Sequence, residues 1–155
     1  MQDGPFRETV DLSGYPDLVM ILLGLRLKSF RALAALPRIG RGLAVIRRVP
    51  PDGLLGQDQF LWGWNHVGIR HYWRDAEALE RFTKAEPHGG WWRDFMRDTQ
   101  GSGFWHELYR ARGGVEAIYV AMPERIGLAS FAPPRKPIGP FMSSADRLRA
   151  DTASR

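Results

Sequence analysis

The chain has 155 residues, a length that fits one compact domain and leaves no room for two full hydrophobic cores. It contains no cysteine, which excludes disulfides, iron–sulfur clusters, thiolate zinc sites and cysteine nucleophiles. The formal net charge is +5, but residues 132–155 hold five basic and two acidic side chains, so the rest of the chain is close to neutral. A nearly neutral body lacks the positive surface that binds a phosphate backbone, and we therefore expect no nucleic-acid partner.

The N-terminal third of the sequence predicts an arm, a strand and a broken helix. Turn formers dominate residues 1–16, which we expect to form the arm. Residues 17–28 are a short, nearly continuous apolar run, which is typical of a buried strand. Residues 29–48 show apolar side chains at helical spacing, and Pro37 with the two glycines that follow it should kink or split that helix.

The middle of the sequence predicts a hairpin and a two-part helical region. Residues 57–64 and 67–73 alternate apolar with polar or small side chains, which indicates two strands joined by a tight turn. Asp75 is a good N-cap for the helical pattern of residues 76–97. Pro87 should interrupt that pattern, because a proline cannot continue a helix.

The last third predicts a second hairpin and a tail. Residues 104–110 and 115–122 alternate again, and a glycine-rich turn separates them, so we expect them to pair. Four prolines then follow in quick succession in a polar segment that we expect to be extended and flexible. The predicted organisation is an arm over residues 1–16, a single domain over residues 17–131 and a tail over residues 132–155.

The order β-α-β-β-α-β is that of the ferredoxin-like split βαβ sandwich, an α+β fold. Its helices cover one face of an antiparallel sheet, and the opposite face here is rich in Trp, Phe and Leu. A second copy of the sheet would bury that face, so we expect a two-fold homodimer with a cavity between the two sheets.

The strand over residues 104–109 places a carboxylate among aromatic rings. Period-two alternation puts Trp105, Glu107 and Tyr109 on one face and His106 on the other. Glu107 is then either a pocket acid or base with a raised pKa, or the partner in a structural salt bridge or hydrogen bond. If it is catalytic, Glu107→Gln should sharply reduce turnover while leaving folding intact.

The four histidines have different predicted roles. His88 lies near a predicted helix start, where it is either a proton acceptor, a haem ligand or a capping residue. His106 is a second candidate haem ligand, whereas we expect His66 to be a turn residue and His71 to pack in the sheet. Neither HxH nor HExxH occurs, so we expect no zinc site.

Arg26 lies among apolar side chains in the first predicted strand. Arg26 either holds the carboxylate of a ligand or pairs with an internal acid such as Glu116 or Glu107. The sequence has no GxGxxG after a strand, no GxxxxGK[ST] and no GxSxG, which argues against dinucleotide, ATP and serine-hydrolase chemistry.

Several linked motifs resemble one small family. They are GLLG at 53–56, HYWRDAEALERF, PHGGWWRDF, GSGFWHELY and EAIYVAMPERIGLA at 116–129. Over residues 18–129 the chain resembles the DUF4188 or fumagillin-type monooxygenase-like family of the dimeric α/β-barrel superfamily. That superfamily includes cofactor-free antibiotic-biosynthesis monooxygenases and haem proteins such as aldoxime dehydratases. The chain departs from the family at Gly89, since the residue after the histidine is more usually not glycine.

The resemblance implies a small homodimeric monooxygenase-like enzyme acting on an apolar molecule of aromatic, terpenoid or polyketide type. The implied catalytic residues are His88, Glu107 and His106. The implied substrate-binding residues are Arg26, Trp91, Trp105, Tyr109 and Tyr119. We expect no cofactor and no metal, and a cytoplasmic protein with no membrane partner, since the polar start has no secretory signal. The alternatives are a haem enzyme, with His88 or His106 as the axial ligand, and a non-redox cyclase, isomerase or binding protein.

Overall fold

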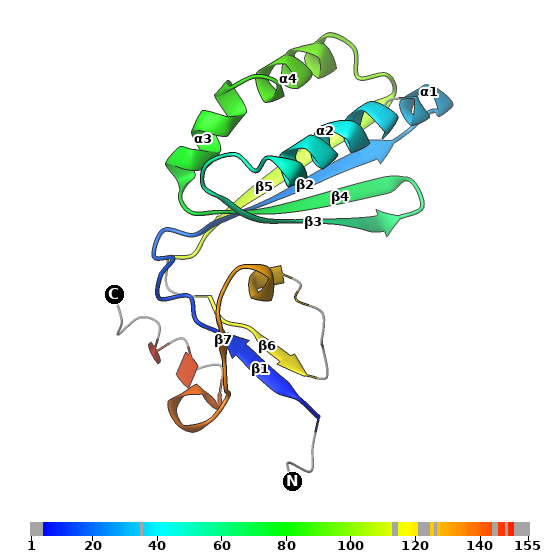
Figure 1. Cartoon of the computed structure of the whole chain (residues 1–155). Helices are drawn as coiled ribbons and strands as arrows, with labels where there is room; N and C mark the ends of the chain where they lie inside the picture. Colours follow the sequence, from blue (N-terminus) through cyan, green and yellow to red (C-terminus); the bar gives the residue numbers. More distant parts are fainter. Residues whose placement is uncertain are drawn as a thin grey trace. The chain divides into compact units, whose positions relative to one another are not determined.

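The structure, a computed structural model, describes residues 5–34, 36–112, 115–120, 125, 127–143, 146–147 and 149–150. Its contacts divide the chain into two compact units (Figure 1). The sheet unit is formed by residues 19–109, and the terminal unit by residues 1–18 and 110–155. None of the helices among the described residues has the length and apolar character needed to cross a membrane. The domain boundaries that the sequence suggests at residues 17 and 131 stay a prediction.

The sheet unit is built on four strands in the order β3-β4-β2-β5. They are β2 (Val19–Leu27), β3 (Leu54–Gly63), β4 (His66–Trp73) and β5 (Ser102–Arg110). Strand β4 pairs antiparallel with β2 and with β3. Main-chain hydrogen bonds join Lys28 to Gly101 at one end of β2, which brings β5 alongside it. The predicted ferredoxin-like α+β fold with an antiparallel sheet is confirmed.

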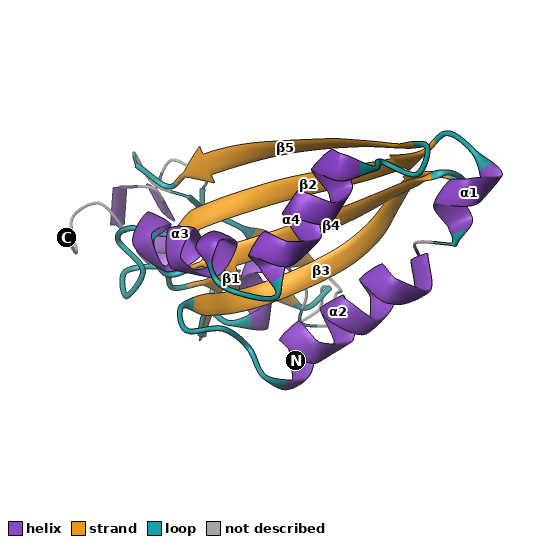
Figure 2. Cartoon of the chain, turned by 90° about the horizontal axis from the view of Figure 1, so that it is seen from above, coloured by secondary structure: helices purple, strands orange, loops and turns teal. Residues whose placement is uncertain are grey.

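Helices cover one face of this sheet. They are α1 (Phe30–Leu33), α2 (Leu36–Arg48), α3 (Ala76–Lys84) and α4 (His88–Arg97). Figures 1 and 2 show α2, α3 and α4 on the same side of the strands. The N-cap predicted for α3 is confirmed, because the Asp75 carboxylate accepts a hydrogen bond from the Ala78 N–H at 2.7 Å.

The first helical region breaks at a different place from the one predicted. Helix α1 ends at Leu33 and α2 begins at Leu36, so Pro37 lies in the first turn of α2, where a missing N–H leaves no helical bond unmade. Helix α2 continues through Gly40 and Gly42, so the predicted split does not occur at the two glycines. A Cβ on Gly42 would lie 2.6 Å from the Trp91 ring of α4, so the two helices meet closely there.

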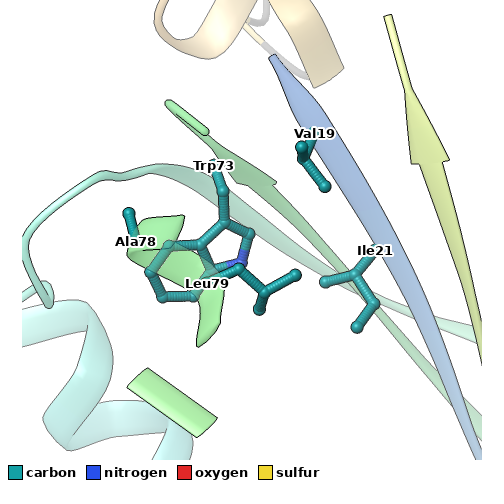
Figure 3. Close-up of a cluster of buried hydrophobic side chains, with 5 residues drawn as sticks. All are labelled: Val19, Ile21, Trp73, Ala78 and Leu79. Atoms are coloured by element: carbon teal, nitrogen blue, oxygen red, sulfur yellow. The ribbon is translucent and has the colours of Figure 1, made fainter. Parts of the chain in front are cut away.

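The hydrophobic core of the sheet unit joins β2 and β4 to α3. Its buried members are Val19, Ile21, Trp73, Ala78 and Leu79 (Figure 3). Trp73 is fully buried, and its ring packs 5.1 Å from that of Phe82. This cluster fixes α3 to the sheet beside the cavity described below.

The terminal unit has its own three-stranded antiparallel sheet, in the order β6-β1-β7. Its elements are β1 (Arg7–Val10), β6 (Ile118–Val120), β7 (Pro134–Arg135), η1 (Gly127–Ser130) and η2 (Gly139–Phe141). The predicted hairpin between residues 104–110 and 115–122 is therefore wrong. Its first strand is in the other sheet and its second pairs with β1, because alternation marks a strand without specifying its partner.

Candidate functional site

A cavity of about 560 Å³ lies between the sheet and the helices of the sheet unit. Strands β2, β4 and β5 and helices α2, α3 and α4 all contribute to its walls. The apolar side chains of its lining are Ile21, Leu23, Leu25, Ile39, Leu43, Ile46, Ile69, Leu79, Phe82, Trp91, Trp92, Phe95 and Phe104. A concave, mostly apolar cavity of this size with few polar groups is the usual form of a small-molecule site.

Strand alternation explains why these side chains meet. In the register of β2 with β4, Ile21 lies opposite His71 and Leu23 lies opposite Ile69. Residues directly opposite each other in an antiparallel pair share a face, so all four point toward the helices. The same alternation directs Phe104 and His106 of β5 into the cavity.

His88, the first residue of α4, is held in one orientation at the cavity wall. Its Nδ1 lies 3.1 Å from the carbonyl oxygen of Thr83. A carbonyl only accepts, so this contact assigns the proton to Nδ1 and leaves a lone pair on Nε2 in the neutral ring. The Phe82 ring packs at 4.9 Å from the imidazole and limits its movement. His88 therefore has the chemistry of a proton acceptor or of a metal ligand through Nε2.

His71 is the most buried titratable group of the cavity wall, with 4% of its surface exposed. No described residue offers its buried Nε2 a hydrogen bond. Burial, with a smaller contribution from the charge of His88, lowers the pKa of His71 to about 4. His71 is thus a neutral imidazole at physiological pH. The sequence predicts only a packing role for it, although its place opposite Ile21 gives the signal that it faces the cavity.

Polar groups gather where α2 and the end of α4 reach the cavity. Arg38 contributes an exposed guanidinium to the lining, and two acidic side chains are already paired. Asp98 lies 3.4 Å from Arg31, and Asp94 lies 3.8 Å from Arg97. No cluster of three or more His, Asp or Glu side chains within the described residues is arranged to hold a metal ion.

The opposite face of the sheet carries a separate aromatic cluster. The Trp105 Nε1–H donates to His66 Nε2 at 2.8 Å, and the Trp62 ring lies 5.9 Å from that of Trp105. A Cβ on Gly24 would lie only 2.0 Å from Trp105 Nε1, so the indole lies flat against β2. We call this surface the outer face, and it does not contribute to the cavity lining. His66, predicted in a turn, is the first residue of β4.

Glu107 and Tyr109 share that outer face with Trp105, as the alternation of β5 requires. The Tyr109 hydroxyl donates a hydrogen bond to the Glu107 carboxylate, which raises the pKa of Tyr109. Arg26 lies opposite His66 in the β2–β4 pair and is exposed. Glu116, which the sequence offers as an Arg26 partner, instead accepts from Arg147 at 2.7 Å in the terminal unit.

The predicted site residues therefore fall into two groups. The cavity brings together His88, Trp91 and His106. The outer face carries Arg26, Trp105, Glu107 and Tyr109. Tyr119 is in β6 of the terminal unit, and its side chain lies outside the part of the structure that is described. His71 joins the cavity group as a residue for which the sequence predicts no site role.

Solved structures share the fold of this chain. An aldoxime dehydratase crystallised with butyraldoxime has a TM-score of 0.60 at 22% identity, over 83% of this chain and 37% of its own. A conserved protein of Bacteroides thetaiotaomicron, described as a possible oxidoreductase, has a TM-score of 0.50 at 13% identity, over 61% of this chain and 98% of its own. A variant of SnoaB, a cofactor-independent oxygenase from Streptomyces nogalater, has a TM-score of 0.49 at 16% identity, over 62% and 94%. At these identities and TM-scores, the aldoxime dehydratase and the Bacteroides protein show a shared fold and nothing more. The SnoaB variant, with a TM-score below 0.5, is too distant to support any inference.

Sequence comparison gives the family. None of the curated protein sequences compared with this chain matches it significantly. Residues 18–128, which are most of the chain, match the model of a protein family described as Monooxygenase af470-like. The matched segment contains β2 to β5, α1 to α4 and thus the entire cavity lining. The predicted resemblance to a monooxygenase-like family is confirmed, and the chain belongs to the Monooxygenase af470-like family.

Proposed function

We propose that this protein is an oxygenase that binds an apolar small molecule in the cavity between sheet and helices. The observation that carries the proposal is His88, whose bond to Thr83 leaves Nε2 free as a proton acceptor in a mostly apolar cavity. Membership of a monooxygenase-like family supports the same reaction class. The proposed chemistry does not require Glu107, which lies on the outer face.

The proposed reaction needs only the substrate, dioxygen and a base. His88 Nε2 takes a proton from an activated C–H or O–H bond, and the electron-rich anion reduces dioxygen and combines with it. The resulting peroxide takes the proton back from His88 and loses water, which leaves a carbonyl group on the substrate. One dioxygen is consumed per molecule: one oxygen atom enters the product and the other leaves as water.

Oxygen uptake with electron-rich aromatic compounds tests the proposal. With 1-naphthol as the first probe, we expect one dioxygen to be consumed for each 1,4-naphthoquinone formed, and a label from ¹⁸O₂ to enter the quinone. His88→Gln should slow uptake by about 100-fold or more, because positioned bases contribute that much. His66→Gln, on the outer face, is the matched control and should retain the wild-type rate.

Two results would contradict the proposal. Equal uptake by wild type and His88→Gln would remove His88 from the reaction. Binding of the aromatic compounds without any uptake of oxygen would favour a non-redox cyclase, isomerase or binding protein that uses the same cavity.

A haem enzyme is the second candidate, and the same histidine favours it. His88 Nε2 has the free lone pair that an axial ligand needs, and the apolar walls suit a porphyrin. Arg38 offers a positive charge for a propionate, and His106, which also lines the cavity, is the alternative ligand. Bound haem would supply a redox-active iron.

A visible absorption spectrum separates the two candidates. If haem is used, adding haem to the purified chain should give a Soret band that shifts on reduction and is lost in His88→Ala or His106→Ala. A spectrum that is only the sum of free haem and protein would contradict the haem candidate.

A further inference from the structure

We propose that His71 and His88 form a hydroxyl-binding subsite, so that the ligand of the cavity is an apolar molecule with a hydroxyl group at its buried end. This inference rests on the proposed function only in taking the cavity as the ligand site. It adds the polar group that the ligand carries and the two atoms that recognise it.

The first observation is the orphaned nitrogen of His71. The side chain comes from β4 and lies in the cavity wall, 4% exposed, with its Nε2 shielded from solvent and without a hydrogen bond from any described residue. Buried polar atoms in folded proteins are nearly always paired, because an unpaired one loses its hydrogen bonds to water without replacement. A ligand atom in the cavity would supply the missing partner.

The second observation is the orientation of His88. Its Nδ1–H is used by the Thr83 carbonyl, so the only hydrogen-bonding position that it can offer a ligand is the Nε2 lone pair. His71 and His88 both line this cavity. The cavity therefore presents one imidazole that can only accept and a second, neutral one that is able to donate.

A hydroxyl group offers the hydrogen-bonding functions that both histidines need. Its hydrogen is donated to His88 Nε2, while its oxygen accepts from the Nε2–H tautomer of His71. An ether satisfies His71 alone, and a hydrocarbon satisfies neither nitrogen. The side chains around the two rings, Ile21, Phe82 and Trp91, are apolar and match the rest of such a ligand.

The test compares three probes with the same ring system. They are 1-naphthol, 1-methoxynaphthalene and naphthalene, measured on the full chain by equilibrium dialysis at pH 7.5. We expect 1-naphthol to bind at least tenfold more tightly than either of the others. The two weaker probes are the more apolar ones, so burial of apolar surface alone predicts the opposite order.

Variants assign the preference to the two histidines. In His71→Leu the advantage of 1-naphthol over naphthalene should disappear while naphthalene still binds. His66→Leu is the control on the outer face and should keep the wild-type ratio. If a variant fails to fold, the affinities of the three probes for the wild-type protein still test the hydroxyl subsite.

Each other outcome has a definite meaning. Equal affinity for the three probes would overturn the hydroxyl subsite and leave the cavity as the proposed oxygenase site. An undiminished preference in His71→Leu would remove His71 from the subsite. Absence of binding by all three probes would overturn the subsite and the proposed function together.

Discussion

Three histidines of this protein have different chemistry because their surroundings differ. His66 accepts a hydrogen bond from Trp105 on the outer face. His88 donates to the Thr83 carbonyl and keeps a free Nε2 in the cavity wall. His71 is buried and neutral, with an unpaired Nε2. These differences are not visible in the sequence, because the partner of His66 is 39 residues away in the chain and the partner of His88 lies on another helix.

His71 should make the stability of the fold depend on pH. Its pKa is about 4 in the folded state and 6.5 in the unfolded chain, so protonation favours unfolding. The contribution is fully present above pH 6.5 and is lost as the pH falls toward 4. Between pH 7.5 and pH 4.5 we expect wild type to lose roughly 2 to 3 kcal/mol more unfolding free energy than His71→Leu. Urea denaturation of both proteins at the two pH values measures this difference.

Other titratable groups are common to wild type and variant, so the comparison isolates His71. The same loss of unfolding free energy in both proteins would show that His71 is not a buried neutral group.

At the scale of elements, local signals in the sequence predict much of the fold. The alternation of residues 57–73 predicts the β3–β4 hairpin, and Asp75 caps α3 as expected. The alternation in β5 also assigns Trp105, Glu107 and Tyr109 to one face. It does not show which face the helices cover. The grouping of Glu107 with His88 in a single site comes from the family resemblance instead.

The long-range pairings are the part that the sequence does not predict. Strand β6 pairs with β1, more than 100 residues away, and no local pattern specifies that partner. The role of Glu107 in turnover likewise stays a prediction, since it depends on what covers the outer face.

Helix α2 contains a matched pair of glycines that tests the wall between α2 and α4. A Cβ on Gly42 would meet the Trp91 ring at 2.6 Å, whereas a Cβ on Gly40 would meet nothing within 4 Å. Gly40→Ala should therefore stabilise the fold by up to about 1 kcal/mol through helix propensity. Gly42→Ala should destabilise it by about 1 to 2 kcal/mol, because overpacking outweighs that gain.

Urea denaturation compares the two variants with wild type. Gly42→Ala should also weaken ligand binding in the cavity, since displaced Trp91 is one of its walls. Equal effects of the two substitutions on stability would contradict close packing of Gly42 against Trp91.

At the scale of the whole molecule, the sheet has two faces of different character. The helix side encloses the cavity with His71 and His88. The outer face leaves large aromatic side chains in contact with solvent, including Trp62 at 55% and Tyr109 at 47% exposure. Exposed aromatic surface of this kind is typical of protein interfaces.

We propose that a second copy of the chain covers the outer face. Light scattering at micromolar concentration should then give twice the 17.6 kDa mass of the chain. Trp62→Glu should reduce the mass to that of one chain, because it buries a charge in the contact. Phe30→Glu, which replaces the 92% exposed side chain at the start of α1, is the matched control and should leave the mass unchanged. A wild-type mass of 17.6 kDa would contradict the dimer.

A crystal structure of the protein with 1-naphthol tests the location of the functional site most directly. We expect the ring system in the cavity against Ile21 and Trp91, with its hydroxyl oxygen within hydrogen-bonding distance of His71 Nε2 and His88 Nε2. A ligand bound on the outer face against Trp105 and Glu107, with the cavity between sheet and helices left empty, would contradict the assignment of the site.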